Sequence, residues 1–142
     1  MKHYFDVEEK LEKILHILND LASELAKGTP IIVEGKRDVE ALNELEVKGD
    51  YITAMNRSEN LLELLSEVEK YGKDEVILLM DFDQKGRELT RYVMRHLENM
   101  KIKPNVIFWK EISSLLRRDI KDIEGLPAYL KTMKRKIGKG IE

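Results

Sequence analysis

Acidic residues follow two short apolar segments of the sequence in an arrangement that suits metal binding. The segment PIIVEG contains Glu34 and ends in a glycine, and the segment VILLMDFD ends in Asp81 and Asp83. Residues two positions apart on an extended chain point to the same side, so Asp81 and Asp83 share a face. Two carboxylates held that close repel each other unless a proton or a cation lies between them. Hard oxygen ligands of this kind suit Mg²⁺ or Mn²⁺.

The elements that must position these acids are short strands that alternate with helices. Apolar runs rich in Ile and Val predict strands at 31–33, 51–54, 76–80 and 106–109. Amphipathic stretches predict helices at about 38–45, 58–71 and 87–100. Three of the strand runs are apolar on both faces, as in a parallel sheet that is covered on both sides. The sequence therefore predicts an α/β three-layer sandwich with a four-stranded parallel sheet.

The acids also suggest the order of the strands. In an open parallel α/β sheet, ligands bind at the carboxyl ends of the strands. Glu34 would face the same ion as Asp81 only if the first and third strands are neighbours. We therefore infer the strand order 2-1-3-4 from the need to bring these carboxylates together.

Each acidic residue also has a purely structural interpretation. Asp83 could cap the helix that follows it and Asp38 the helix after the first strand, because Asp is a favoured N-cap residue. Glu34 and Gly35 could form an ordinary turn. Taken singly, these interpretations are the better ones. The metal site is favoured because three carboxylates and two glycines all fall at the same end of two buried strands.

Charge is distributed unevenly along the chain. Its 25 basic and 27 acidic residues give a net charge of −2, which by itself argues against a polyanionic partner. Residues 29–83 hold 6 basic and 14 acidic side chains, whereas residues 84–142 hold 15 and 7. The near-neutral total is thus a cancellation. The basic stretch could hold phosphates, or it could be a solvated helical face.

Helices are predicted on both sides of the strand-containing segment. Residues 4–27 form a helical pattern with one apolar seam, ended by Gly28 and Pro30. The seam could form a homodimer or partner contact, but we favour packing on the rest of this chain. Short helices are expected at 111–118 and 127–136, before a frayed tail. We expect one domain overall, made of an N-terminal helix, a core and a C-terminal helical extension with a basic tail, at 1–28, 29–110 and 111–142.

The composition also bears on the cellular compartment. The chain has no cysteine, which excludes disulfides and thiolate metal sites and fits a reducing interior. No apolar run approaches the ~20 residues of a membrane span, and the first residues are too charged for a signal peptide. We therefore expect a cytoplasmic protein without a membrane partner.

The segment from about residue 30 to residue 109 resembles the Toprim domain, which topoisomerases, bacterial-type primases and small nucleases share. The resemblance rests on a strand ending in Glu-Gly, here IIVEGKRD, and a later strand ending in Asp-x-Asp-x-x-Gly, here DFDQKG. The region after the fourth strand loosely resembles the nucleases that mature ribosomal RNA, where Lys110 would correspond to a lysine of that branch. The 142 residues hold no segment resembling the further domains of topoisomerases or primases, so we expect a small stand-alone Toprim protein.

The resemblance implies a role for each matching residue. Glu34 would be the general acid/base or a metal ligand, and Asp81 and Asp83 would bind Mg²⁺, or alternatively Mn²⁺. Asp38 would support these ligands from behind. Cations beside the acids would contact phosphates, although they could equally be solvated residues at helix starts: Lys36, Arg37, Lys85 and Arg87.

Two functions remain open at this point. The first is a Mg²⁺-dependent nuclease or related phosphotransferase acting on RNA or DNA. The second is a non-catalytic module that binds nucleic acid with the help of a metal, or recruits a partner. Haloacid-dehalogenase-type phosphatases also carry Asp-x-Asp, but there the motif lies near the domain start and is followed by Thr or Val, where Gln84 and Lys85 stand here. A P-loop is excluded because Lys36 lacks the earlier glycine and the following Ser or Thr.

Overall fold

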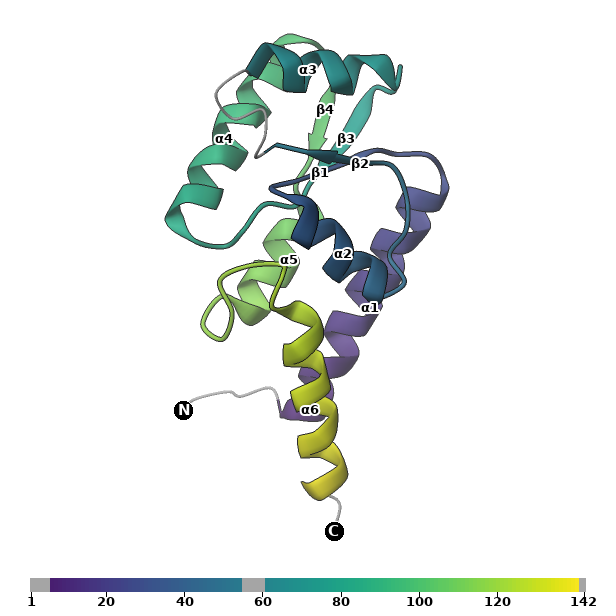
Figure 1. Cartoon of the computed structure of the whole chain (residues 1–142). Helices are drawn as coiled ribbons and strands as arrows, with labels where there is room; N and C mark the ends of the chain where they lie inside the picture. The colour runs from purple at the N-terminus through teal and green to yellow at the C-terminus, as the bar shows by residue number, and fades with distance from the viewer. Residues whose placement is uncertain (1–5, 55–60, 141–142) are drawn as a thin grey trace.

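The centre of the fold is a parallel four-stranded sheet in the order β2-β1-β3-β4, which confirms the predicted order. The computed structural model describes residues 6–54 and 61–140. The strands, drawn as arrows in Figure 1, are β1 (Ile31–Val33), β2 (Tyr51–Thr53), β3 (Glu75–Leu78) and β4 (Lys103–Asn105). Ile31 of β1 pairs with Tyr51 on one side and with Ile77 on the other. The strands that precede Glu34 and Asp81 are therefore neighbours.

Helices cover both faces of this sheet, as the predicted three-layer sandwich requires (Figure 1). Alternation along β1 sends Ile31 and Val33 into one apolar core and Ile32 into the other. Helices α1, α2, α5 and α6 close the first core, and α3 and α4 close the second. Their bounds are α1 (Val7–Ala26), α2 (Lys36–Glu44), α3 (Leu61–Lys70), α4 (Gln84–Asn99), α5 (Ile107–Leu116) and α6 (Leu126–Gly140). The predicted first residues of two helices, 4–5 and 58–60, lie outside the described residues.

The apolar seam of α1 packs inside this chain. Leu11, Ile14, Leu18 and Leu21 on this helix are buried in the first core, where α5 and α6 contact it. Gly28 follows the helix with φ +97°, a left-handed conformation that favours glycine and ends the helix there, as predicted. No helix within residues 6–54 and 61–140 is long and apolar enough to cross a membrane.

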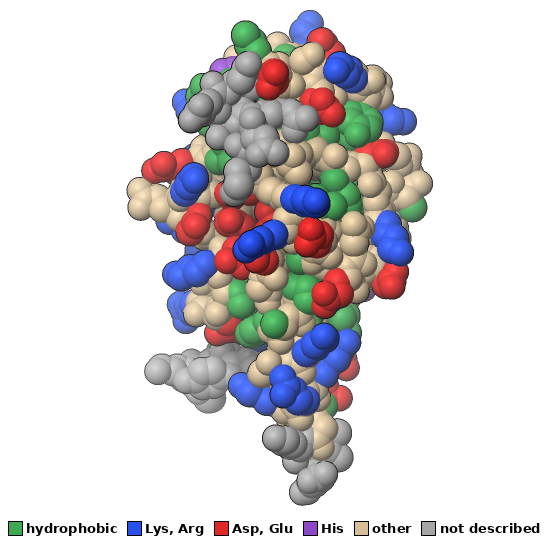
Figure 2. Space-filling model, viewed as in Figure 1, with side chains coloured by type: hydrophobic (Ala, Val, Ile, Leu, Met, Phe, Trp, Pro, Cys, Tyr) green, Lys and Arg blue, Asp and Glu red, His purple; other side chains and the backbone are tan. Residues whose placement is uncertain are grey.

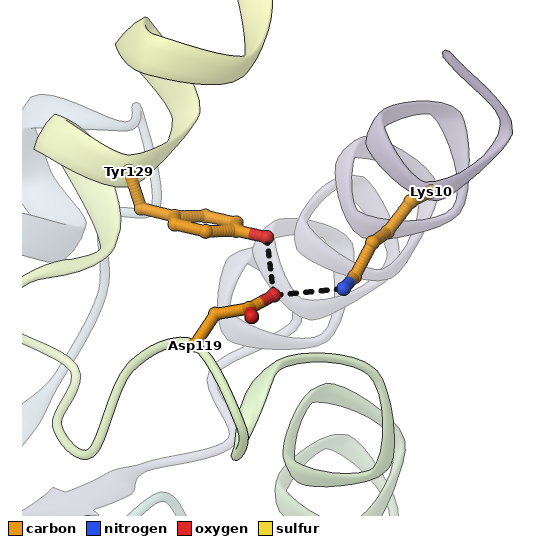
Figure 3. A network of polar contacts seen from close by, with 3 residues as sticks. All are labelled: Lys10, Asp119 and Tyr129. Carbon is orange, nitrogen blue, oxygen red and sulfur yellow. Dashed lines mark hydrogen bonds and ion pairs between the residues drawn. The ribbon is translucent and has the colours of Figure 1, made fainter. Parts of the chain in front are cut away.

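A polar network ties α1 to the C-terminal helices (Figure 3). The Lys10 ammonium lies 2.8 Å from a carboxylate oxygen of Asp119, and the Tyr129 hydroxyl donates a hydrogen bond of 2.7 Å to the same oxygen. These donors lower the pKa of Asp119, with the hydrogen bond from Lys10 as the main cause. Three segments that are distant in sequence, α1, the α5–α6 connection and α6, are thereby joined at one carboxylate.

Two sequence-based expectations about the last third of the chain are wrong. The fourth strand is Lys103–Asn105, and the apolar run at 106–109 begins α5 instead. This run is apolar because Phe108 is buried in the first core, while β4 lies at the edge of the sheet, where Pro104 is tolerated. The C-terminal helix is also longer than the expected 127–136, because α6 continues to Gly140.

Candidate functional site

Glu34 and Asp81 meet at the carboxyl edge of the sheet. The backbone N–H of Asp81 donates a hydrogen bond of 2.8 Å to the Glu34 carboxylate, although 47 positions separate the two residues. Ile32 of β1 pairs with Leu78 of β3, so the two strands deliver their following residues to the same place. The Glu34 side chain is buried, with only 6% of the residue exposed. The predicted convergence of these two acids is thus found.

Asp38 joins the same cluster from the first turn of α2. Its carboxylate accepts a hydrogen bond of 3.0 Å from the backbone N–H of Gly35, the residue that begins the helix. Asp38 is therefore the third residue of α2, and its side chain bonds back to the residue that caps the helix. Asp38 is not the N-cap itself. Burial raises the pKa of this carboxyl to about 6, because the Gly35 hydrogen bond offsets burial only in part and Glu34 adds a negative charge nearby.

The Asp81 carboxyl carries the strongest electrostatic penalty of the cluster. Burial, together with the negative charges of Glu34 and Asp38, raises its pKa to about 7. The backbone N–H of Ile123 donates a hydrogen bond of 3.3 Å to this carboxylate, which acts in the opposite direction. Near neutral pH, a proton or a cation would therefore relieve repulsion among the three acids.

Asp83 begins α4 and caps it. Its carboxylate accepts a hydrogen bond of 2.8 Å from the backbone N–H of Gly86, as the structural interpretation of this residue predicted. Gly86 is required here, because a Cβ atom at this position would lie 2.1 Å from the backbone carbonyl oxygen of Asp81. The glycine that ends DFDQKG thus permits the first turn of α4 to pack against the backbone of Asp81, a candidate metal ligand.

The donor set of the cluster fits a hard divalent cation. Glu34, Asp38, Asp81 and Asp83 each use one carboxylate oxygen to accept a backbone N–H, and the second oxygen of each makes no hydrogen bond within the described residues. No three acidic or histidine side chains in residues 6–54 and 61–140 converge closely enough to hold one ion together. Mg²⁺ does not require three, because it is often bound by one or two carboxylates and keeps several waters.

The four predicted phosphate-binding cations lie at the starts of the two helices that flank the acids. The Arg37 guanidinium lies 3.4 Å from the Glu124 carboxylate, but both side chains are largely exposed. Arg87 donates a hydrogen bond of 3.2 Å to the carbonyl of Phe82. Lys36 and Lys85 are exposed and form no ion pair with any described residue. All four cations are therefore attached to the chain close to the acids. The side chain of Arg87 is held by its hydrogen bond to the backbone of the Asp-x-Asp motif.

The connection between α5 and α6 also contributes to the site, which sequence reasoning missed. The N–H of Phe82 donates a hydrogen bond of 2.8 Å to the carbonyl of Lys121, beside the contact of Ile123 with Asp81. Asp122 adds a further negative charge that raises the pKa of Asp81. The indole N–H of Trp109 donates a hydrogen bond of 3.3 Å to the Asp81 carbonyl. Trp109 belongs to α5 and not to a strand. The one available signal was the Asp-x-x-Gly turn at 122–125, in which the Asp122 carboxylate accepts the Gly125 N–H.

Comparisons with known proteins agree with the fold and the two motifs. A sequence model of the Toprim domain matches residues 28–108. A UPF0292 protein of Methanocaldococcus jannaschii is 38% identical over 123 residues, which cover 87% of this chain and 94% of the relative. A UPF0292 protein of Methanosarcina barkeri is 30% identical over 130 residues, covering 92% and 89%. A solved structure from Aquifex aeolicus shares the fold with a TM-score of 0.63 and 24% identity, covering 77% of this chain and 94% of its own.

Proposed function

The chain belongs to the Toprim domain family, and from that premise we propose that it is a Mg²⁺-dependent phosphoryl-transfer protein, a small nuclease acting on RNA or DNA. The observation that supports this most directly is the contact between Glu34 and Asp81 at the carboxyl edge of β1 and β3. It places two acids from separate motifs at one point, where one of them has a pKa raised to about 7. The lack of cysteine fits the cytoplasm as the place of this activity.

In this proposal each residue of the cluster has one task. Asp81 and Asp83 hold the cation through the carboxylate oxygens that make no hydrogen bond within the described residues. Glu34 either binds the ion with Asp81, in the place of Asp83, or moves a proton to or from the attacking or leaving oxygen. Asp38 keeps the turn at Gly35 in place and adds negative charge behind the ligands. When bound, Mg²⁺ would neutralise charge on the phosphate oxygens.

The cations at the two helix starts would hold the substrate. Arg37 and Lys36 follow Glu34 directly in the chain, and Lys85 and Arg87 follow Asp83. The Arg37 ion pair with Glu124 is weak, because both partners are half or more exposed to water. A phosphate could replace Glu124 at little cost and would be bound bidentately by the guanidinium.

A second function, a metal-assisted nucleic-acid-binding module without catalysis, is favoured by one observation. Asp83 already uses an oxygen to cap α4, and no three acids of the described residues converge on one point. A cation that is bound by two carboxylates can bind a phosphate without orienting an attacking nucleophile.

An assay on labelled RNA and DNA oligonucleotides with Mg²⁺ or Mn²⁺ separates the two functions. We expect the wild type to cleave at least one of them, and Glu34→Gln and Asp81→Asn to lose about 100-fold or more in rate. Glu69→Gln is the matched control, because this exposed residue near the end of α3 undergoes the same charge change away from the cluster. Metal-dependent binding without any cleavage would favour the second function, and equal cleavage by all variants would exclude this site.

A further inference from the structure

Helix α6 carries a basic face that no ion pair among residues 6–54 and 61–140 explains. Lys131, Lys134 and Arg135 are exposed and lie at spacings of three and four residues, which places them on one side of the helix. None of them forms an ion pair with another described residue. Figure 2 shows Lys and Arg side chains gathered over α6, below the mixed acidic and basic surface in the middle of the same view.

The needs of the helix itself do not account for this basic face. Cations stabilise a helix C-terminus through the helix dipole, but this effect falls off within the last turn, and Lys131 lies in the first half of α6. Like charges at these spacings repel each other, and α6 contains no acidic residue that would offset the repulsion. The face therefore costs the isolated protein stability, and a polyanionic partner would remove that cost.

Lys131, the first residue of this basic face, lies beside α2, the helix that follows the Glu34-Gly35 turn. A hollow of about 400 Å³ lies between α2 and α6, which contact each other. Its charged lining residues are Lys131 and Arg37 together with Glu40, Glu44 and Glu124. Arg37 lies in the first turn of α2, directly after the Glu34-Gly35 turn. A strand bound along Lys134 and Arg135 could thus pass Lys131 and Arg37 before it reaches Glu34.

We propose that the basic face of α6, made of Lys131, Lys134 and Arg135, binds the phosphate backbone of the nucleic acid on which the acidic cluster acts. This inference rests on the proposed function, and it deepens that function by assigning substrate binding to a helix beyond the matched domain at 28–108. Phosphate is the chemistry that fits, because regularly spaced anions on a flexible chain can follow a row of cations, and bound counterions are released on contact.

The test measures binding with labelled single-stranded RNA and DNA oligonucleotides of equal length by fluorescence anisotropy. EDTA is present throughout, so that any cation at the acidic cluster is removed. The variant changes Lys131, Lys134 and Arg135 to Gln. The matched control changes the exposed Lys70, Lys73 and Lys103 to Gln, which alters the net charge equally at the opposite edge of the sheet. Circular dichroism verifies that both variants are folded.

We expect the α6 variant to bind about tenfold or more weakly at low salt, and its slope of log K against log[salt] to fall by about 2–3, whereas the control stays within about twofold of wild type. The RNA and DNA arms show which polymer is preferred. Equal losses in both variants, or no loss in the α6 variant, would overturn the inference. Equally tight binding of poly-glutamate would overturn the assignment to phosphate.

Failure of this inference and failure of the proposed function are distinguishable. If the α6 variant binds normally while Glu34→Gln abolishes cleavage, the acidic cluster acts without this surface. If the α6 variant loses binding but the wild type cleaves neither polymer, the surface stands and the catalytic part of the proposed function is wrong.

Discussion

The backbone N–H of Asp81 donates a 2.8 Å hydrogen bond to the buried carboxylate of Glu34. This bond joins the Glu-Gly motif after β1 to the Asp-x-Asp motif after β3, and so holds the two motifs together before any cation binds. It also keeps two negative side chains close in a partly buried place, which is electrostatically unfavourable. We therefore expect the cluster to lower the free energy of unfolding of the protein when all of its carboxyl groups are ionised.

The first prediction concerns the pH dependence of stability. The pKa of Asp81 is raised from 3.8 to about 7 in the folded protein, so the folded state holds its proton more tightly than the unfolded state. The contribution of this tighter proton binding to the free energy of unfolding is fully present below about pH 4 and is lost as the pH rises through 7. We expect the free energy of unfolding without metal to fall over this range, as measured by urea unfolding.

The variant Asp81→Asn should flatten that pH dependence. It keeps an oxygen that can accept the Ile123 N–H but carries no charge. At about pH 8 it should be more stable than wild type without metal, by about 1–2 kcal/mol. Asp74→Asn, at an exposed residue before β3, serves as the control and should leave the profile unchanged. An unaltered profile in Asp81→Asn would show that this carboxyl is ionised at little cost.

A second prediction concerns Gly86 at the start of α4. Gly86→Ala should lower the free energy of unfolding by about 2–4 kcal/mol, because its Cβ would lie 2.1 Å from the Asp81 carbonyl oxygen. Gly138→Ala in α6 is the matched control, since nothing lies within 4 Å of its Cβ, and it should stabilise by about 0.5–1 kcal/mol. Thermal unfolding measures both. A neutral Gly86→Ala would mean that α4 does not pack this closely on Asp81.

A third prediction separates the two roles of Asp83. Asp83→Ala removes the cap of α4 and should cost about 1 kcal/mol of stability, whereas Asp83→Ser keeps a side-chain acceptor for the Gly86 N–H and should restore most of it. If Asp83 also binds the cation, both variants should bind Mg²⁺ more weakly by isothermal titration calorimetry. Wild-type Mg²⁺ affinity in Asp83→Ser would limit this residue to capping.

A fourth prediction concerns the network of Lys10, Asp119 and Tyr129. Tyr129→Phe and Lys10→Met should each destabilise the protein by up to about 1 kcal/mol, and their effects should be non-additive because both donors bind one oxygen. The pKa of Asp119 is lowered, so the stability from these contacts is present above about pH 4 and is lost as the pH falls further. A double-mutant cycle at about pH 7 and pH 3 checks both statements, and additive effects at pH 7 would contradict them.

Sequence reasoning predicted the sheet order and the meeting of Glu34 with Asp81 because both depend on strong, regular signals. The runs that became β1 and β3 are apolar on both faces, and only the order with these strands adjacent brings their acidic ends together. Gly28 ended α1 where expected because a left-handed residue there strongly favours glycine.

The regions that sequence reasoning misjudged depend on tertiary contacts. Strand β4 is three residues long and contains Pro104, so it has no apolar pattern, while the apolar run after it belongs to a helix that buries Phe108. The contact of Ile123 with Asp81 spans 42 positions, and Ile123 takes part in it through its backbone N–H. The type of residue at position 123 therefore gives no sign of this contact.

The central claim, a cation site shared by Glu34 and Asp81, is tested most directly by titrating the protein with Mn²⁺ and measuring free Mn²⁺ by electron paramagnetic resonance. The wild type should bind one Mn²⁺ per chain, and Glu34→Gln and Asp81→Asn should each weaken binding about tenfold or more. The control Glu69→Gln, at an exposed residue of α3, should bind as wild type does. Wild-type affinity in both Glu34→Gln and Asp81→Asn, or no binding by the wild type, would contradict the claim.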